Sequence, residues 1–203
     1  MDDDFTKKFY ELKAAKYAEE TLPIRLDDLW NIFSAMLCPG AYVLDLGCGA
    51  GRDLKELARR GFCVIGLEYS VPLAELARQY SRQEVWVGDM RVFDLGVRKF
   101  DGIWAVASLL HIPRNEISGV LRNLYDALRS KGILLTSMKK GERNETAPDG
   151  RNFEFYQPQE WERMLKTVGF EIEGHQTSTE KRQTLSGDAR QIDWFVTIAR
   201  KNL

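Results

Sequence analysis

Apolar residues fall along the chain in short runs that alternate with segments of helical periodicity. The short runs predict buried strands at 41–46, 62–67, 84–87, 100–107, 133–138, 170–176 and 191–200. Apolar spacing of three and four residues predicts helices at 5–20 and 24–37, followed by helices that begin near Asp53, Pro72, Pro113 and Pro158. Proline suits the last three starts because the first turn of a helix tolerates it.

Strands that alternate with helices predict an α/β fold, a doubly wound, seven-stranded and mostly parallel sheet with helices on both faces. No helix separates the last two predicted strands, so we expect a hairpin in which the last strand is antiparallel. No internal repeat or low-complexity linker divides the chain. We therefore expect residues 1–203 to form a single domain, with N-terminal helices within 1–40 and a polar insertion at 139–157.

The end of the first predicted strand carries the most specific pattern in the chain. From residue 43 to residue 53 the sequence reads VLDLGCGAGRD, so Asp45 precedes glycines at 47, 49 and 51. Glycine lets a ligand approach the backbone closely, and open α/β sheets bind ligands at the carboxyl ends of their strands. A dinucleotide motif would place its third glycine at position 52, which is Arg52 here. The pattern therefore favours a nucleotide-like ligand other than NAD or FAD.

Two further strand ends carry acidic residues. Glu68 ends the second strand, and a carboxylate about 20 residues beyond a glycine turn suits hydrogen bonds to both hydroxyls of a ribose. Asp89 and Met90 follow the third strand. Carboxylates at the ends of three successive strands are expected to lie at one edge of the sheet, which points to a single ligand site.

This arrangement resembles the class I S-adenosylmethionine-dependent methyltransferases, whose first motif is D-x-G-x-G-x-G. The resemblance extends from about residue 10 onward and implies S-adenosylmethionine as the cofactor. It also implies that Asp89 holds the adenine amino group, that Met90 packs near the ring, and that Tyr17 belongs to an N-terminal lid. The cofactor-binding residues expected are Tyr17, Asp45, Gly47, Gly49, Gly51, Glu68, Tyr69, Asp89, Met90 and Ala105, the last through its backbone carbonyl or that of a neighbour.

The residues that follow the fourth strand are expected to border the reactive methyl group. His111 is the candidate general base because the ordinary pKa of histidine lies near the operating pH, although a packing or capping role is the alternative. Ser108 and Asn115 are alternatives for orienting the acceptor. In the 139–157 insertion, Tyr156 is the second catalytic candidate, and Arg151 and Lys139 are further candidates on the substrate side.

Composition adds limits on the partners and on the compartment. The formal net charge of −1 gives no general attraction to nucleic acid, and no His, Cys and Asp cluster has the spacing of a metal site. The acidic N-terminus has no signal-peptide pattern, no run is long enough to span a membrane, and the three cysteines fit a reducing setting. We therefore expect a cytoplasmic monomer or homodimer.

The predicted function is methyl transfer from S-adenosylmethionine to oxygen or nitrogen of a small-molecule acceptor. Two alternatives remain open at this point. Some tRNA-modifying enzymes share a segment like the Ser108–His111 stretch, so a modified tRNA base is one possible acceptor, which the lack of excess basic residues disfavours. The other alternative is a module that binds the cofactor without catalysis, because the expected cofactor residues would be the same.

Overall fold

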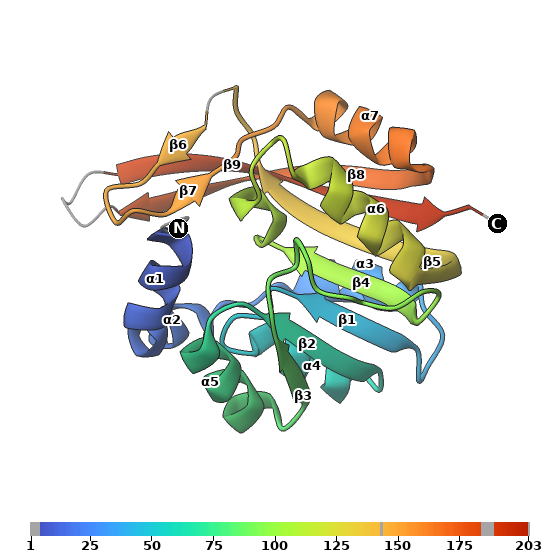
Figure 1. Ribbon diagram of the computed structural model, residues 1–203, viewed down its shortest axis with the longest axis horizontal. Coiled ribbons are helices and arrows are strands. Elements are labelled where there is room, and N and C mark those ends of the chain that lie inside the picture. Colours follow the sequence, from blue (N-terminus) through green and yellow to red (C-terminus); the bar gives the residue numbers. More distant parts are fainter. Residues whose placement is uncertain (1–4, 143, 184–188, 203) are drawn as a thin grey trace.

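The computed structural model describes residues 5–142, 144–183 and 189–202. Its main sheet has seven strands in the order β3-β2-β1-β4-β5-β9-β8, as Figure 1 shows. These strands are β1 (Tyr42–Leu46), β2 (Cys63–Glu68), β3 (Glu84–Val87), β4 (Phe100–Val106), β5 (Leu128–Lys139), β8 (Phe170–Gln183) and β9 (Ala189–Lys201). The pairs among β1 to β5 are parallel, whereas β9 runs antiparallel to both β5 and β8. The α/β fold predicted from the sequence is therefore confirmed, including its antiparallel last strand.

Helices cover both faces of the sheet, and two short N-terminal helices lie at the carboxyl ends of its central strands (Figure 1). They are α1 (Phe5–Leu12), α2 (Ala14–Thr21), α3 (Asp27–Ala35), α4 (Arg52–Arg59), α5 (Val71–Ser81), α6 (Ile117–Ala127) and α7 (Pro158–Val168), with a 3-10 turn, η1 (Leu109–His111). Apolar side chains of α6 and α7 pack on one face, and those of α3, α4 and α5 pack on the other. Because β1 is covered on both sides, Val43, Leu44 and Leu46 are fully buried, as is typical of a parallel strand.

The N-terminal helices differ from the single long helix that periodicity predicts. Residues 5–20 form α1 and α2 instead, because the backbone of Lys13 leaves the helical conformation with φ −112° and ψ 14°. Small side chains, Ala14 and Ala18 of α2, then pack against Leu73 of α5. This break lets two short helices turn across the carboxyl ends of the central strands.

Three other boundaries also differ from the sequence prediction. The helix expected from Pro113 begins only at Ile117, because the Pro113 carbonyl accepts the backbone N–H groups of Glu116 and Ile117 in a separate turn. Strand β5 begins at Leu128 rather than at the predicted residue 133, and Lys131 inside it has φ +63°. The insertion at 139–157 contains a small hairpin of β6 (Glu145–Thr146) and β7 (Asn152–Phe153).

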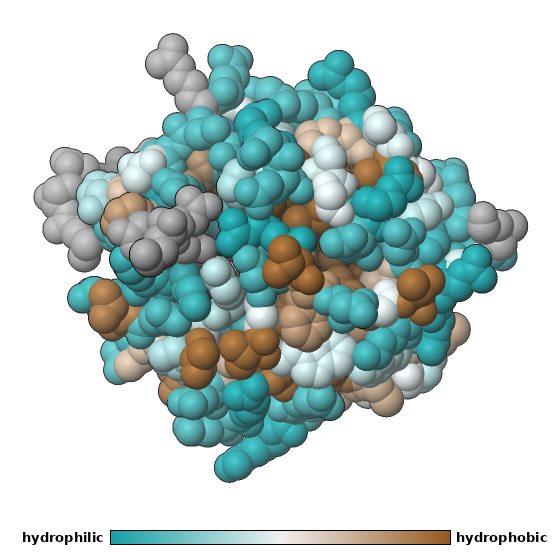
Figure 2. Space-filling model, viewed as in Figure 1, coloured by the Kyte–Doolittle hydropathy of each residue, from teal (hydrophilic) through white to brown (hydrophobic). Residues whose placement is uncertain are grey.

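The surface has no single dominant apolar area in the view of Figure 2, where hydrophobic residues are scattered among hydrophilic ones. Val92 and Val97, which follow β3, are among the apolar residues with the highest exposed fractions. Within the described ranges no helix combines the length and hydropathy needed to cross a membrane.

Candidate active site

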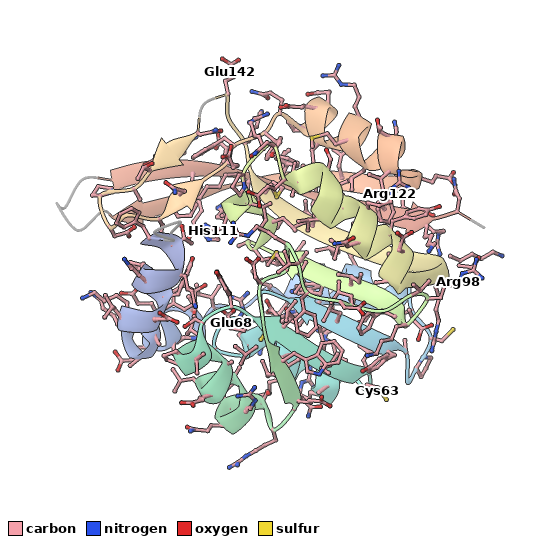
Figure 3. All side chains as sticks on the ribbon, viewed as in Figure 1. Cys63, Glu68, Arg98, His111, Arg122 and Glu142 are labelled. Carbon is pink, nitrogen blue, oxygen red and sulfur yellow. The ribbon has the colours of Figure 1, made fainter. Side chains whose placement is uncertain are left out.

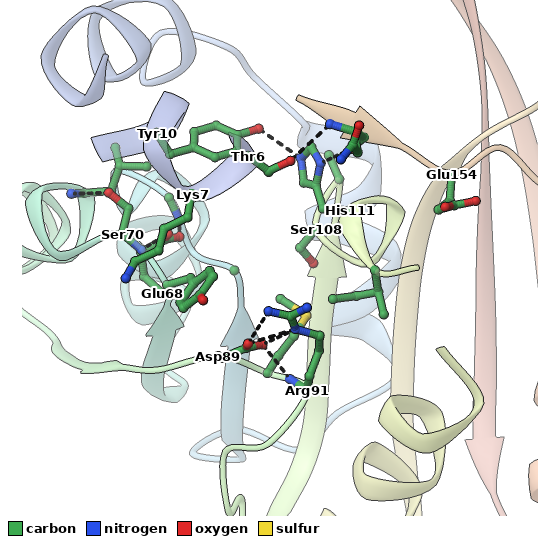
Figure 4. A pocket seen from close by; sticks show the side chains of 18 of the residues that line it. Thr6, Lys7, Tyr10, Glu68, Ser70, Asp89, Arg91, Ser108, His111 and Glu154 are labelled. Atoms are coloured by element: carbon green, nitrogen blue, oxygen red, sulfur yellow. Dashed lines mark hydrogen bonds and ion pairs between the residues drawn. The ribbon is translucent and has the colours of Figure 1, made fainter. Parts of the chain in front are cut away.

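A cavity of about 370 Å³ lies at the carboxyl ends of the central strands. Residues that follow β1, β2, β3 and β4 form its floor and sides, and side chains of α1 and α2 cover it, as Figure 4 shows for Thr6, Lys7 and Tyr10. Its volume falls in the range of small-molecule sites, about 300–1,000 Å³. This is the edge at which the sequence predicts a nucleotide-like ligand.

The three glycines after β1 all have positive φ, but their surroundings differ. A Cβ atom on Gly47 would lie 2.5 Å from the Cβ of Ser108, and one on Gly51 would lie 2.9 Å from the Cα of Ala77. A Cβ on Gly49 would meet only the Tyr17 ring, at 3.4 Å. Gly47 and Gly51 therefore allow the backbone to pack closely against neighbouring elements, whereas Gly49 leaves room in the cavity itself.

Glu68, the last residue of β2, is buried and connects the glycine turn to the start of α5. Its carboxylate accepts the backbone N–H of Gly49 and that of Ser70, each at 2.8 Å. Burial raises the pKa of Glu68, and the hydrogen bonds from backbone N–H groups oppose that shift. The backbone N–H of Tyr69 also favours the ionised carboxylate, and since such a group has about four acceptor sites, at least one remains for a ligand. Glu68 and the neighbouring Tyr69 both line the cavity.

After β3, Asp89 and Met90 line the same cavity. Both Asp89 oxygens accept hydrogen bonds from the Arg91 guanidinium, at 3.0 and 2.8 Å from Nε, and this partner raises the pKa of Arg91. Arg91 also lies 3.5 Å from Glu116, at the start of α6. Asp89 is therefore held in place by a cation, and any bond to a ligand group would be made in addition to that pair.

Two tyrosines form the cover over the cavity. The rings of Tyr10 and Tyr17 meet edge to face with centroids 5.1 Å apart, and burial raises the pKa of both hydroxyls. The Tyr10 hydroxyl lies 3.0 Å from Nε2 of His111, and Thr6 accepts the backbone N–H of Asn152 at 3.0 Å. Helix α1 is thus bonded to η1 and to β7, about 100 and 146 residues away along the chain.

Both ring nitrogens of His111 have partners. Nδ1 lies 2.8 Å from the carbonyl oxygen of Asn152, which can only accept, so Nδ1 carries the hydrogen. Nε2 then accepts the hydrogen bond from Tyr10. Burial lowers the pKa of His111 to about 4, so the ring is neutral at pH near 7. This geometry favours the packing alternative for His111 over the general base, although the residue does line the cavity.

The opposite wall consists of residues after β4 and after β7. Ser108, Ile112 and Pro113 lie here, together with Glu154, whose backbone N–H donates to the Leu110 carbonyl at 2.7 Å. The Ser108 hydroxyl and Oε2 of Glu154 are buried and have no hydrogen-bond partner. Ala107, Ile112 and Pro113 form the apolar part of this side of the cavity, and its polar residues are Ser108, His111, Glu116, Asn152 and Glu154.

Four of the residues expected to bind the cofactor or to act in catalysis do not line the cavity, and neither do the substrate-side alternatives Asn115, Arg151 and Lys139. Asp45 is buried behind the glycine turn, where burial and the nearby Asp53 carboxylate raise its pKa. Gly51 packs on α5, and Ala105 is fully buried within β4, so that Ala107 and Ser108 reach the cavity instead. Each lies one layer behind the surface that a ligand would contact.

Tyr156, the second catalytic candidate, is the fourth, and the structure places its side chain in the core rather than on the cavity. Its side chain is 1% exposed and packs on Trp161, with ring centroids 5.1 Å apart, while the Arg114 guanidinium lies 4.2 Å from its ring centre. Its neighbours in the insertion are also engaged, because Arg151 pairs with Asp149 at 2.7 Å and Lys139 lies over the Phe153 ring at 3.3 Å. Aromatic residues of this segment thus serve the core.

Sequence reasoning missed most of the cover and of the far wall. The cavity residues it did not single out are Thr6, Lys7, Tyr10, Ser70, Leu73, Arg91, Ala107, Ile112, Pro113, Glu116, Asn152 and Glu154. The polar insertion indicated that some of its residues would reach the site. Only the fold shows that Glu154 lines the cavity, whereas Tyr156 is buried in the core. In the described part of the chain, no group of three or more His, Cys, Asp and Glu side chains could hold a metal ion.

Comparison with known proteins agrees with this geometry. Residues 43–132 match the family model described as a methyltransferase domain. The sterol 24-C-methyltransferase of Yarrowia lipolytica is 26% identical over 79% of this chain and 45% of its own length. The ubiquinone biosynthesis O-methyltransferase of Xanthomonas campestris is 31% identical over 57% of this chain and 48% of its own. The chain spans about half the length of the curated relatives it matches.

Solved structures show the same fold. The 1,6-didemethyltoxoflavin-N1-methyltransferase of Burkholderia thailandensis, solved with its substrate and S-adenosylhomocysteine, has a TM-score of 0.73 at 19% identity, covering 98% of this chain and 88% of that one. The cyclase SpnF has a TM-score of 0.77 at 17% identity, over 97% and 95%. The chain has the fold of the class I S-adenosylmethionine-dependent methyltransferases, and residues 43–132 match the methyltransferase domain model. S-adenosylmethionine, the cofactor expected from the sequence, is the cofactor of this class.

Proposed function

We propose that this chain transfers a methyl group from S-adenosylmethionine to oxygen or nitrogen of a small-molecule acceptor. The observation that carries this proposal is the cavity itself, because Gly49, Glu68 and Asp89 line it together at the carboxyl edge of the sheet. A cyclase shares the fold, so the fold alone does not decide the reaction. The family match over residues 43–132 supports transfer of a methyl group.

The residues present fit the cofactor. Gly49 leaves space where a side chain would intrude, Glu68 keeps acceptor capacity for the ribose hydroxyls, and Met90 offers an apolar contact for adenine. Asp89 would accept from the adenine amino group, and Tyr17 would close over the ligand. When bound, S-adenosylmethionine supplies an electrophilic methyl group on a positively charged sulfur. Asp45, Gly51 and Ala105 would support this site by shaping the strand ends and the turn behind it.

The protein's own contribution to the reaction is placement and the exclusion of water. Tyr10 and Tyr17 cover the cavity, and Ile112 and Pro113 make part of its far wall apolar. Holding an acceptor next to the methyl donor in such a site supplies much of the rate enhancement of a displacement at carbon. His111 is neutral and fully hydrogen-bonded, which suits a residue that fixes the wall rather than one that removes a proton.

The same geometry supports a small acceptor and a single domain. The cavity has a volume of about 370 Å³, which suits a small molecule, and the near-neutral net charge gives no drive toward RNA. The relatives that match include enzymes named for sterol and for ubiquinone biosynthesis. Residues from α1 at one end of the described chain and from the 139–157 segment line one cavity, which supports one domain with a lid at 1–40 and a substrate-side insertion.

Transfer of a labelled methyl group tests this function. The purified chain is incubated with S-adenosylmethionine labelled in the methyl group and with a small-metabolite extract, and in parallel with total tRNA. We expect label in an organic-soluble or small polar product of the metabolite reaction. Label in tRNA alone would replace the small-molecule acceptor by a nucleic acid, and no label in either reaction, with cofactor binding intact, would leave only a binding module.

A further inference from the structure

Two buried polar atoms that lack hydrogen-bond partners belong to residues on one wall of the cavity. Six buried side-chain oxygen or nitrogen atoms lack a hydrogen-bond partner among the described residues. Only two of them belong to residues that line the cavity, the hydroxyl of Ser108 and Oε2 of Glu154. Leaving a buried acceptor unpaired is costly, so such atoms commonly await a ligand. Both lie on the wall opposite Glu68 (Figure 4).

Glu154 has a cation nearby, but that cation is held by other groups. Nε of Arg114 lies 3.5 Å from Oε2 of Glu154, which is an ion contact rather than a hydrogen bond. The terminal nitrogens of Arg114 donate instead to Glu160, at 2.6 Å, and to the Phe155 carbonyl. Burial raises the pKa of Glu154, and Arg114 opposes that shift. The backbone N–H of Arg114 also favours the ionised carboxylate, so the group is partly compensated in charge, while its Oε2 atom has no hydrogen-bond donor.

The other carboxylates of the cavity are already engaged or are exposed. Glu68 accepts two backbone N–H groups, and Asp89 accepts hydrogen bonds from Arg91. Glu116 has only an ion contact with Arg91 at 3.5 Å, as Glu154 has with Arg114, but the Glu116 side chain is 41% exposed and water can bind it. His111 has partners on both nitrogens. On the wall opposite Glu68, Glu154 is therefore the charged side chain best able to accept a hydrogen bond from a ligand.

We propose that Glu154 binds the N–H or O–H group of the methyl acceptor and takes its proton during transfer, which makes the acceptor a hydrogen-bond donor such as an amine, a nitrogen heterocycle or a phenol. This assignment rests on the proposed methyltransferase function. The Ser108 hydroxyl, also unpartnered, would accept from or donate to a second polar atom of the same acceptor. A tertiary amine or a thioether, which carries no hydrogen on the atom that is methylated, would have no such donor to place against Glu154.

The proton balance of this step is simple. A lone pair on the acceptor nitrogen or oxygen forms a bond to the methyl carbon, and the electron pair of the carbon–sulfur bond moves to sulfur, which becomes the neutral thioether of S-adenosylhomocysteine. The hydrogen that the acceptor atom carried passes as a proton to the Glu154 carboxylate and from there to solvent. No oxidant or metal is needed, and a raised pKa makes this carboxylate a better proton acceptor than an exposed one.

Binding of two matched probes tests the assignment without any turnover. Benzimidazole carries one N–H donor, and 1-methylbenzimidazole has the same ring system with a methyl group in place of that hydrogen. Affinities for both are measured by NMR titration of the chain saturated with S-adenosylhomocysteine. The variants are Glu154→Gln and, as control, Glu142→Gln, since Glu142 is exposed at the far end of the same insertion and points away from the molecule (Figure 3).

We expect benzimidazole to bind the native chain about tenfold or more tightly than its methylated analogue, as a hydrogen bond to a charged group would give. Glu154→Gln should lose that preference, and Glu142→Gln should keep it, with the affinity for S-adenosylhomocysteine unchanged in both. If benzimidazole binds the native chain no better than 1-methylbenzimidazole, or if Glu154→Gln retains the preference, the assignment is wrong. Loss of S-adenosylhomocysteine binding by the native chain would instead refute the proposed function.

Discussion

Gly49 and Gly51 stand two residues apart in one turn, yet the structure gives them different tasks. Gly51 has φ +89° and lies against the backbone of α5, where an added methyl group would lie 2.9 Å from the Cα of Ala77. Gly49 has φ +55° and opens on the cavity beside Tyr17. A repeated glycine in a motif can therefore serve packing at one position and ligand approach at another.

The first prediction contrasts these two glycines. Gly51→Ala should lower the free energy of unfolding by about 2–4 kcal/mol, because positive φ and overpacking add. Gly49→Ala should cost only about 1–2 kcal/mol from its positive φ, but should weaken S-adenosylhomocysteine about tenfold or more by intruding on the cavity. Chemical denaturation and calorimetry measure the two effects. Equal loss of stability in both variants would show that Gly49 also has a packing role.

Sequence reasoning worked at single residues where a backbone pattern constrains them. The glycine turn, Glu68 and Asp89 follow directly from strand ends, and the structure places Gly49, Glu68 and Asp89 on the cavity. It could not separate a residue that faces the cavity from one that backs it, since Asp45 and Gly51 belong to the same motif. Tyr156 shows the same limit, because only tertiary packing on Trp161 turns it toward the core.

At the scale of elements, α1 is tied down by contacts that no local pattern encodes. Tyr10 meets His111 in η1, and Thr6 meets Asn152 in β7. Apolar periodicity indicated that residues 5–20 were helical, but it predicted one helix and did not indicate where the chain would turn at Lys13. The start of β5 was missed for a related reason, because the strand is extended back to Leu128 by the pairing of that residue with Phe100 of β4 rather than by its own apolar run.

The second prediction concerns that connection. Tyr10→Phe removes the donor to Nε2 of His111, a bond worth about 0.5–1.5 kcal/mol. Amide hydrogens of α1 should then exchange about three- to tenfold faster, and S-adenosylhomocysteine should dissociate faster. Tyr80→Phe on α5 is the matched control, because that ring is exposed and far from η1 along the sheet. Hydrogen-exchange mass spectrometry resolves the helix, and unchanged protection of α1 would contradict the role given to Tyr10.

The whole molecule is the scale at which the sequence prediction was most successful. Alternating strands and helices predicted the doubly wound sheet, and the missing helix between the last strands predicted the antiparallel β9. These features follow from short-range patterns and general rules of chain connection. The cover and the far wall instead join segments more than 100 residues apart, as Tyr10 and His111 do, and such pairings leave no signal in one sequence.

The third prediction links His111 to the stability of the entire fold. Its pKa is about 4 in the folded chain against an ordinary 6.5, so the unfolded chain takes up a proton first as the pH falls. Its contribution to stability is complete above about pH 6.5 and is lost as the pH falls toward about 4. Between about pH 7.5 and about pH 4.5 the native chain should therefore lose roughly 2–3 kcal/mol more than His111→Gln.

Urea denaturation of both proteins at the two pH values gives this difference, and the other titrating groups largely cancel in the comparison. A native chain and a His111→Gln variant that lose stability in parallel would show that His111 is charged in the fold. That result would also reopen its role as a general base, because a histidine with an ordinary pKa could exchange protons near neutral pH.

Binding of S-adenosylhomocysteine by the native chain, Glu68→Gln and Glu75→Gln tests most directly whether the cavity is a cofactor site. Glu68 lines the cavity, whereas Glu75 is exposed on α5 and serves as the control. Calorimetry and thermal unfolding should show one ligand per native chain and a ligand-dependent rise in Tm. Glu75→Gln should behave as native, and Glu68→Gln should bind about 10- to 100-fold more weakly. A native chain with neither binding heat nor a rise in Tm, or a Glu68→Gln variant that binds as tightly as native, would contradict the cofactor site.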